Sequence, residues 1–157
     1  MLATGLVRAL ELRHDWSNVS SALDWAITRK NDPDTGVSGH ELAGRLAFGC
    51  QGLWESQIPA IEGRRWVEQI ASGLAPGECL DWMHYIRAVL AMQLDDFVVV
   101  HQQLDDLVES ADTGPQAAAQ AAGLLAFLSC RQYLDRAREL VAKSVQICDT
   151  HELGPEH

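Results

Sequence analysis

The sequence predicts an all-α fold of stacked antiparallel helical hairpins, and three observations lead to this prediction. No stretch of the 157 residues sustains the alternation of apolar and polar side chains that is typical of a strand. Apolar residues instead recur every three or four positions, as they do on one face of a helix. A shift of 37 residues also aligns apolar positions of successive segments, for example Ala60 with Phe97 and Leu134.

The first expected element is a leading helix or pair of helices within residues 1–30. Its apolar residues follow the helical rhythm at Trp16, Val19, Leu23, Ala26 and Ile27. The same helix can extend upstream through Leu6, Val7 and Leu10. Residues 31–39, "NDPDTGVSG", are rich in Asp, Pro and Gly and therefore predict a loop.

Further helical segments follow this loop, which gives about seven helices in total. They are expected at residues 40–56, 59–73, 77–94, 96–111, 115–131 and 133–150. Pro59 and Pro115 stand where the first turn of a helix tolerates a missing N–H. Gly73 and Gly114 stand where helices end or links turn. Because the links are short, we expect consecutive helices to be antiparallel.

The internal period groups these helices into three hairpins. The 37-residue shift aligns the columns Val67, Leu104 and Val141; Ala71, Val108 and Val145; Leu53, Leu90 and Phe127; and Gly63, Val100 and Ala137. The period is close to the length of a tetratricopeptide repeat, so a right-handed superhelix of that kind is expected. It would form one domain, residues 1–157, with repeats at 40–74, 77–111 and 114–150 after the leading segment.

Composition and charge disfavour several classes of function. The net charge of −10 disfavours direct contact with nucleic acid or with an anionic membrane surface. No apolar run approaches the roughly 18–20 residues that a membrane-spanning helix needs, and the N-terminus lacks the order of a signal peptide. The four cysteines include no C-x-x-C pair, which predicts free, mostly buried thiols and a cytoplasmic protein.

No group of residues predicts catalysis. His101 and Asp105 are four residues apart on one helix, but no third metal ligand is suggested nearby. Asp95 and Asp96 fall at a hairpin turn, where an aspartate caps the next helix. Asp105 and Asp106 are expected to lie on the solvent-exposed side of a helix. We therefore expect no catalytic residue, no cofactor and no metal, and a protein that is not an enzyme.

The stretch "IEGRRWVEQI" allows two interpretations. Arg64, Arg65 and Trp66 could be a phosphate clamp with a stacking platform, or the polar face and core anchor of a helix. A helical register places Trp66 on the buried face and both arginines on the other side. Glu62 lies three residues before Arg65. Glu68 lies four residues after Arg64, so each arginine is expected to be ion-paired, which favours the packing interpretation.

Three blocks of the sequence follow a known pattern: "RHDWSNVSSALDWAI" at 13–27, "LAGRLAFGCQGLW" at 42–54 and "EGRRWVEQI" at 62–70. They resemble "EHDNLRAALDWAL", "LAxxLxxxW" and "EGRRWLExAL" in the helical-repeat region of bacterial AfsR/LuxR-type regulators. Those large proteins join a signal-transduction ATPase to tetratricopeptide-like repeats. Here Trp16 and Ser17 are inserted in the first block, and the spacing before the tryptophan of the second is loose.

The resemblance implies that this chain is a fragment of a longer regulator, in which such a segment holds the ATPase inactive or binds an inducer. Its function would be that of a protein-interaction or effector-sensing module of a cytoplasmic transcriptional regulator, non-catalytic by itself. Its partners would be other domains of the regulator, a partner protein or a small-molecule effector. The alternative is a free-standing tetratricopeptide-like adaptor that binds a peptide in its concave groove.

A candidate interaction face follows from the expected repeat. The first helix of each hairpin lines the concave surface of such a superhelix. With the column Gly63, Val100 and Ala137 fixing the register, the face comprises Arg45, Phe48, Glu55, Trp82, Tyr85, Val89 and Gln93. Trp82 and Tyr85 could instead be semi-buried helix residues. The repeats lack polar caps, so apolar ends should be exposed, to be covered by neighbouring repeats or in a homodimer.

Overall fold

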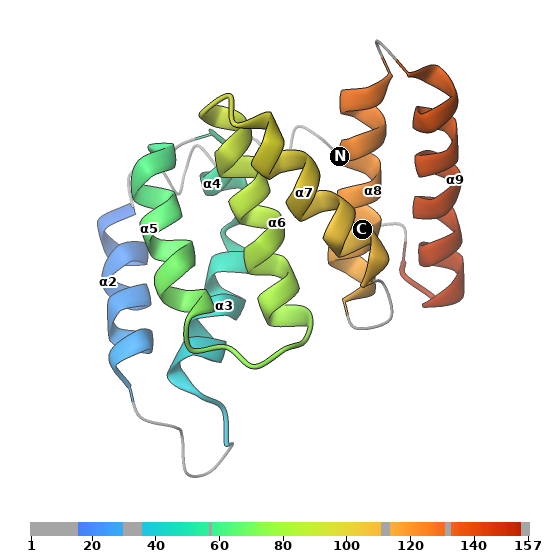
Figure 1. The fold of residues 1–157 in the computed structure, drawn as a ribbon. Coiled ribbons are helices and arrows are strands. Elements are labelled where there is room, and N and C mark those ends of the chain that lie inside the picture. The colour runs from blue at the N-terminus through green and yellow to red at the C-terminus, as the bar shows by residue number, and fades with distance from the viewer. Residues whose placement is uncertain (1–15, 30–35, 57, 111–113, 131–132, 155–157) are drawn as a thin grey trace. The chain divides into compact units, whose positions relative to one another are not determined.

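The computed structural model describes residues 16–29, 36–56, 58–110, 114–130 and 133–154, with the side chains of 55 and 56 excepted. The regular elements in this part of the chain are all helices, without a strand, which confirms the all-α prediction (Figure 1). The predicted upstream extension through Leu6, Val7 and Leu10 lies outside the described residues, as does most of the predicted loop. Among the described helices, none is both long enough and apolar enough to cross a membrane.

The chain divides into two compact units, residues 1–75 and 76–157, and each is described by itself. The described helices of the first unit are α2 (Trp16–Thr28), α3 (Gly39–Gly49), α4 (Gln51–Ser56) and α5 (Ala60–Ala71). Both α2 and α5 pack against α3 (Figure 1). The core of this unit consists of fully buried residues that include Leu23, Ala43, Ala47, Leu53, Trp54, Val67 and Ile70.

The helix predicted over 40–56 is divided at Cys50 into α3 and α4. The indole of the buried Trp54 donates a hydrogen bond of 2.8 Å to the backbone carbonyl of Ala47. In an uninterrupted helix that carbonyl would accept from the N–H four residues later. At the other end of α3, the Ser38 hydroxyl accepts from the Glu41 N–H at 3.0 Å and caps the helix.

A close approach between α2 and α3 requires a glycine. A Cβ built on Gly39 would lie 2.2 Å from the carbonyl oxygen of Ala26 and 2.5 Å from that of Arg29. Real Cβ atoms do not come so close to an oxygen. The first residue of α3 therefore lies directly against the C-terminal turn of α2 because it has no side chain.

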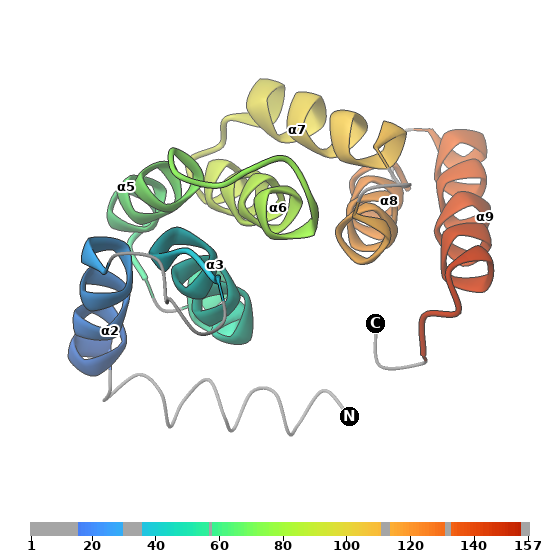
Figure 2. The same cartoon turned by 90° about the horizontal axis from the view of Figure 1, so that it is seen from below.

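The second unit contains α6 (Glu78–Gln93), α7 (Phe97–Glu109), α8 (Pro115–Ser129) and α9 (Leu134–Thr150). In it α7 packs against α6 and α8, α6 also touches α8, and α9 packs against α8 (Figures 1 and 2). Asp96 caps α7 by accepting from the Val99 N–H at 3.3 Å, as expected for an aspartate at this turn. The Ser144 hydroxyl of α9 donates to the Ala119 carbonyl of α8 at 2.9 Å.

Small side chains make up most of the buried face of α8, which also contains Leu125. The buried face of α8 includes Ala117, Ala118, Ala119, Ala121, Ala122 and Ala126. Ala118 and Ala119 form an apolar cluster with Ile147 of α9, on which Cys148 and Leu153 pack. Because an alanine extends only one carbon from the backbone, the α8 backbone can lie close to the helices that cover it.

The starts of five helices repeat with the predicted spacing, whereas α3 begins 39 residues before α6. The helices α5, α7 and α9 begin at Ala60, Phe97 and Leu134, at intervals of 37 residues. The helices α6 and α8 begin at Glu78 and Pro115, again 37 residues apart. The column Gly63, Val100 and Ala137 is buried throughout. The 37-residue period of the sequence therefore also describes these five helix starts, and the tetratricopeptide-like superhelix stays a prediction.

Apolar residues of the last hairpin depart from this regularity in their exposure. Leu104 is fully buried, whereas Val141 in the same column is 53% exposed. Phe127, Leu134 and Val145 are exposed as well. Exposed apolar side chains at the end of the repeat were predicted from the missing polar cap, and the described residues of α8 and α9 confirm this.

Candidate functional site

A pocket of about 500 Å³ lies between α2 and α5 in the first unit. The two helices lie side by side in Figures 1 and 2. The lining residues are Ser20, Ser21 and Asp24 of α2 and Glu62, Arg65, Trp66 and Gln69 of α5. The volume is in the range of small-molecule sites, and most of the lining side chains are polar. This is the candidate site, which we call the α2–α5 pocket.

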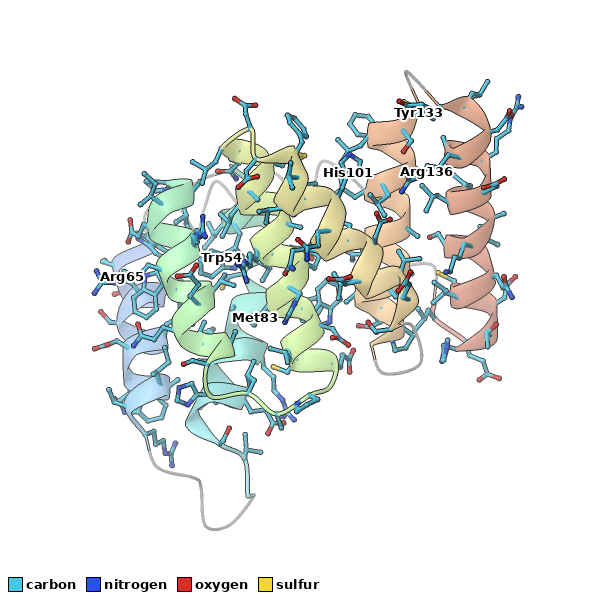
Figure 3. The ribbon with its side chains drawn as sticks, in the orientation of Figure 1. Trp54, Arg65, Met83, His101, Tyr133 and Arg136 are labelled. Atoms are coloured by element: carbon cyan, nitrogen blue, oxygen red, sulfur yellow. The ribbon has the colours of Figure 1, made fainter. Side chains whose placement is uncertain are left out.

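The two adjacent arginines of α5 have different surroundings. The Arg64 guanidinium donates to Glu68 at 2.9 Å between Nε and Oε1, as the spacing of four predicted. Arg65 has no hydrogen bond or ion pair with any residue that the structure describes, although an ion pair with Glu62 was expected. Figure 3 shows Arg65 on the side of α5 that faces α2.

The predicted pair of Glu62 with Arg65 is wrong, and Glu62 has a different partner. The Trp16 indole of α2 donates to Glu62 Oε1, with 3.2 Å between Nε1 and Oε1. The same indole ring packs edge-on against Trp54, with 5.9 Å between the ring centroids. An exposed carboxylate–arginine pair within one helix contributes only a few tenths of a kcal/mol, so a donor from a neighbouring helix can displace it.

Trp66 lies at the edge of the core and contributes to the wall of the pocket. The core-facing positions of α5 are taken by Gly63, Val67 and Ile70, which are buried. Trp66 is only partly buried and lines the pocket together with Arg65. The predicted role of Trp66 as a core anchor therefore holds only for the part of its ring that faces inward.

The α2 wall of the pocket presents hydrogen-bond acceptors. The hydroxyls of Ser20 and Ser21 both donate to the backbone carbonyl of Ser17, at 3.1 and 2.7 Å. Their oxygens therefore keep lone pairs that can accept from a ligand. The exposed Asp24 carboxylate has no partner among the described residues. Sequence reasoning missed this wall, because polar residues on the outer face of a helix are expected in any case.

None of the residues of the predicted interaction face lines the α2–α5 pocket. In the first unit, Arg45 is exposed and paired with Glu41, and Phe48 is partly buried. Glu55 belongs to α4, and its side chain lies outside the described residues.

The other predicted residues of that face belong to α6 in the second unit. Trp82, Tyr85 and Val89 are 3%, 7% and 5% exposed, and Gln93 is exposed. The Trp82 and Tyr85 rings pack edge-on, with their centroids 5.7 Å apart. These two aromatic residues are buried more completely than the semi-buried helix residues of the alternative interpretation. A binding role for this face stays a prediction.

The residues considered as possible metal ligands or nucleophiles do not form a reactive cluster in the part of the chain that the structure describes. Asp105 pairs with Arg136 of α9 at 3.1 Å. In the described parts of the chain, no group of three or more His, Cys, Asp or Glu side chains is arranged to hold a metal ion. The four cysteines are free, but only Cys50 is buried and Cys130 is exposed, so the prediction of mostly buried thiols is wrong. Burial raises the pKa of the Cys50 thiol above its ordinary value, which lowers its reactivity.

Comparisons with known proteins do not assign the chain to a family. It matches no family model, no curated protein and no solved structure. Membership in the AfsR/LuxR-type regulators therefore stays a prediction that rests on the sequence blocks at 13–27, 42–54 and 62–70.

Proposed function

We propose that this chain is an effector-sensing helical-repeat module of a cytoplasmic transcriptional regulator of the AfsR/LuxR type, non-catalytic by itself. The α2–α5 pocket is the observation that supports the proposal. Its walls belong to α2 and α5, and these helices contain most of the sequence blocks at 13–27 and 62–70 that carry the family resemblance. The two blocks are far apart in the sequence and meet at one site.

The packing of the walls suggests how occupancy of the pocket could be sensed. Both α2 and α5 pack on α3, and the Trp16–Glu62 hydrogen bond joins them directly at an exposed position. A ligand that contacts both walls would favour one separation of the two helices over others. A changed separation of α2 and α5 would then alter the surface that this module offers to the attached domains.

The gene around this segment tests the regulator part of the proposal. We expect the reading frame to continue upstream into a P-loop ATPase module. In that full-length protein, deletion of residues 16–71 should change the rate of ATP hydrolysis, measured as phosphate release. A reading frame without an ATPase would instead support the free-standing adaptor that binds an extended peptide.

A further inference from the structure

The α2–α5 pocket combines uncompensated groups of both charges on opposite walls. Arg65 on α5 and Asp24 on α2 line the same pocket, and neither the guanidinium nor the carboxylate has a partner among the described residues. An unpaired guanidinium or carboxylate that lines a pocket is available for a charge-assisted hydrogen bond with a ligand. The sequence supplies carboxylates within reach of Arg65 along its own helix, yet the structure leaves this guanidinium open to the pocket.

The α5 wall fits a carboxylate. The Arg65 guanidinium presents N–H donors in a fork that matches the two oxygens of a carboxylate. The Gln69 side chain also lines the pocket one helical turn further along and adds an amide donor. Arg64 cannot take this role, because its guanidinium pairs with Glu68 and it does not line the pocket.

The α2 wall fits an ammonium group. Asp24 supplies a negative charge, and the Ser20 and Ser21 oxygens accept hydrogen bonds because their protons point to the Ser17 carbonyl. An ammonium group has three donors and no acceptor, so it complements this wall. The Trp66 ring adds an aromatic surface to the pocket, to which a cation is also attracted.

A ligand with only one charge fits less well. A simple anion would be repelled by Asp24 and would lack the ammonium group that offsets this repulsion, on a chain whose net charge is −10. A simple cation would leave Arg65 uncompensated and repelled. A purely apolar ligand would remove these polar groups from water without replacing their hydrogen bonds.

We infer that the α2–α5 pocket binds a small zwitterion, a free amino acid or a short peptide with free ends, with its carboxylate on Arg65 and its ammonium group near Asp24. A pocket of about 500 Å³ has room for a molecule of this size. The inference rests on the proposed function, to which it adds the chemical class of the effector, but it is tested by binding alone.

The first experiment compares ligands that differ only in charge. Isothermal titration calorimetry of the full chain uses the twenty free amino acids and the dipeptide alanyl-alanine. It then uses N-acetylated and C-amidated forms of the tightest ligand, and inorganic phosphate. We expect at least one zwitterion to bind, and loss of either charge to weaken binding about tenfold or more. The absence of binding by every zwitterion would overturn the inference. Equal binding of phosphate or of the N-acetylated form would overturn it as well, in favour of an anion site.

The second experiment uses the two adjacent arginines as a matched pair. Arg65→Gln and Asp24→Asn should each weaken zwitterion binding about tenfold or more, whereas Arg64→Gln should leave it unchanged. Circular dichroism checks that each variant keeps its helices, and the exposed positions of all three side chains favour this. Equal weakening by Arg64→Gln would mean that overall charge, not the pocket, controls binding, and the inference would be wrong.

Failure of this inference and failure of the proposed function can be told apart. A chain that binds no zwitterion but is encoded together with an ATPase keeps its regulatory function and loses only the ligand class. If the chain binds zwitterions through Arg65 but is not attached to an ATPase, the binding site is supported and the proposed regulatory function is wrong.

Discussion

Arg64 and Arg65 are neighbours in the sequence, yet only one of them is paired. The spacing within α5 correctly predicted the Arg64–Glu68 pair. It failed for Arg65, and the observed partner of Glu62 is Trp16, 46 residues earlier in the chain. Spacing along a helix shows which groups can meet, but a donor from another helix is invisible until the helices are packed. The sequence therefore identified both arginines, but it could not predict which of them is ion-paired.

Two tryptophans provide a test of burial at the residue scale. Trp54 is fully buried and hydrogen-bonded, so Trp54→Ala should lower the free energy of unfolding by about 3–5 kcal/mol. Trp66 is partly buried at the edge of the pocket, so Trp66→Ala should cost less, about 1–3 kcal/mol. Urea titrations followed by circular dichroism measure both values. Equal losses would show that Trp66 is packed as deeply as Trp54.

The cysteines should differ in reactivity. The thiolate is the reactive form, and burial raises the pKa of Cys50, so at neutral pH little of this thiol is ionised. Cys130 is exposed, and iodoacetamide should therefore modify Cys130 well before Cys50 in the folded protein. The reaction at Cys50 should become faster only as the pH rises toward its raised pKa. Mass spectrometry of digested samples measures the rate of modification at each cysteine. In concentrated urea, which unfolds the protein, the two rates should become similar.

At the scale of elements, the positions of the helices were the most predictable feature. Pro115, Gly114 and the recurrence of apolar columns place helix starts that the structure confirms at 37-residue intervals. The interruption at Cys50 was not predictable, because it accompanies the contact of the Trp54 indole with a backbone carbonyl. The α2–α5 pocket was not predictable either, because its walls meet through their shared packing on α3.

Equivalent positions in two repeats give a test at this scale. Leu104 in α7 is fully buried, so Leu104→Ala should cost about 2–5 kcal/mol. Val141 occupies the same column in α9 but is exposed, so Val141→Ala should change the stability by less than about 0.5 kcal/mol. Denaturant titrations at low protein concentration measure the difference. A large loss at Val141 would mean that another surface covers this face of α9 in solution.

At the scale of the whole molecule, charge and apolar exposure act in opposite directions. The net charge of −10 makes copies of the chain repel one another near neutral pH. Exposed apolar side chains of the last hairpin, among them Phe127, Val141 and Val145, favour association. The balance between the two effects depends on pH, because the carboxylates lose their charge as the pH falls.

The chain should therefore associate as the pH approaches its isoelectric point of about 4.9. Sedimentation velocity at pH values between about 8 and 5 should show larger species at the acidic end, as expected when net charge approaches zero. Val141→Gln combined with Val145→Gln should reduce this association at the same pH. Association that is unchanged by the two substitutions would assign it to another surface.

The alanine face of α8 also has a consequence for how freely this chain can vary. Side chains larger than alanine at Ala118 or Ala122 would have to displace a neighbouring helix, at a typical cost of 1–3 kcal/mol each. The outer face of α9 imposes no such limit. Natural variants and saturation libraries should therefore keep small residues along α8 and accept many kinds of residue on the helix beside it.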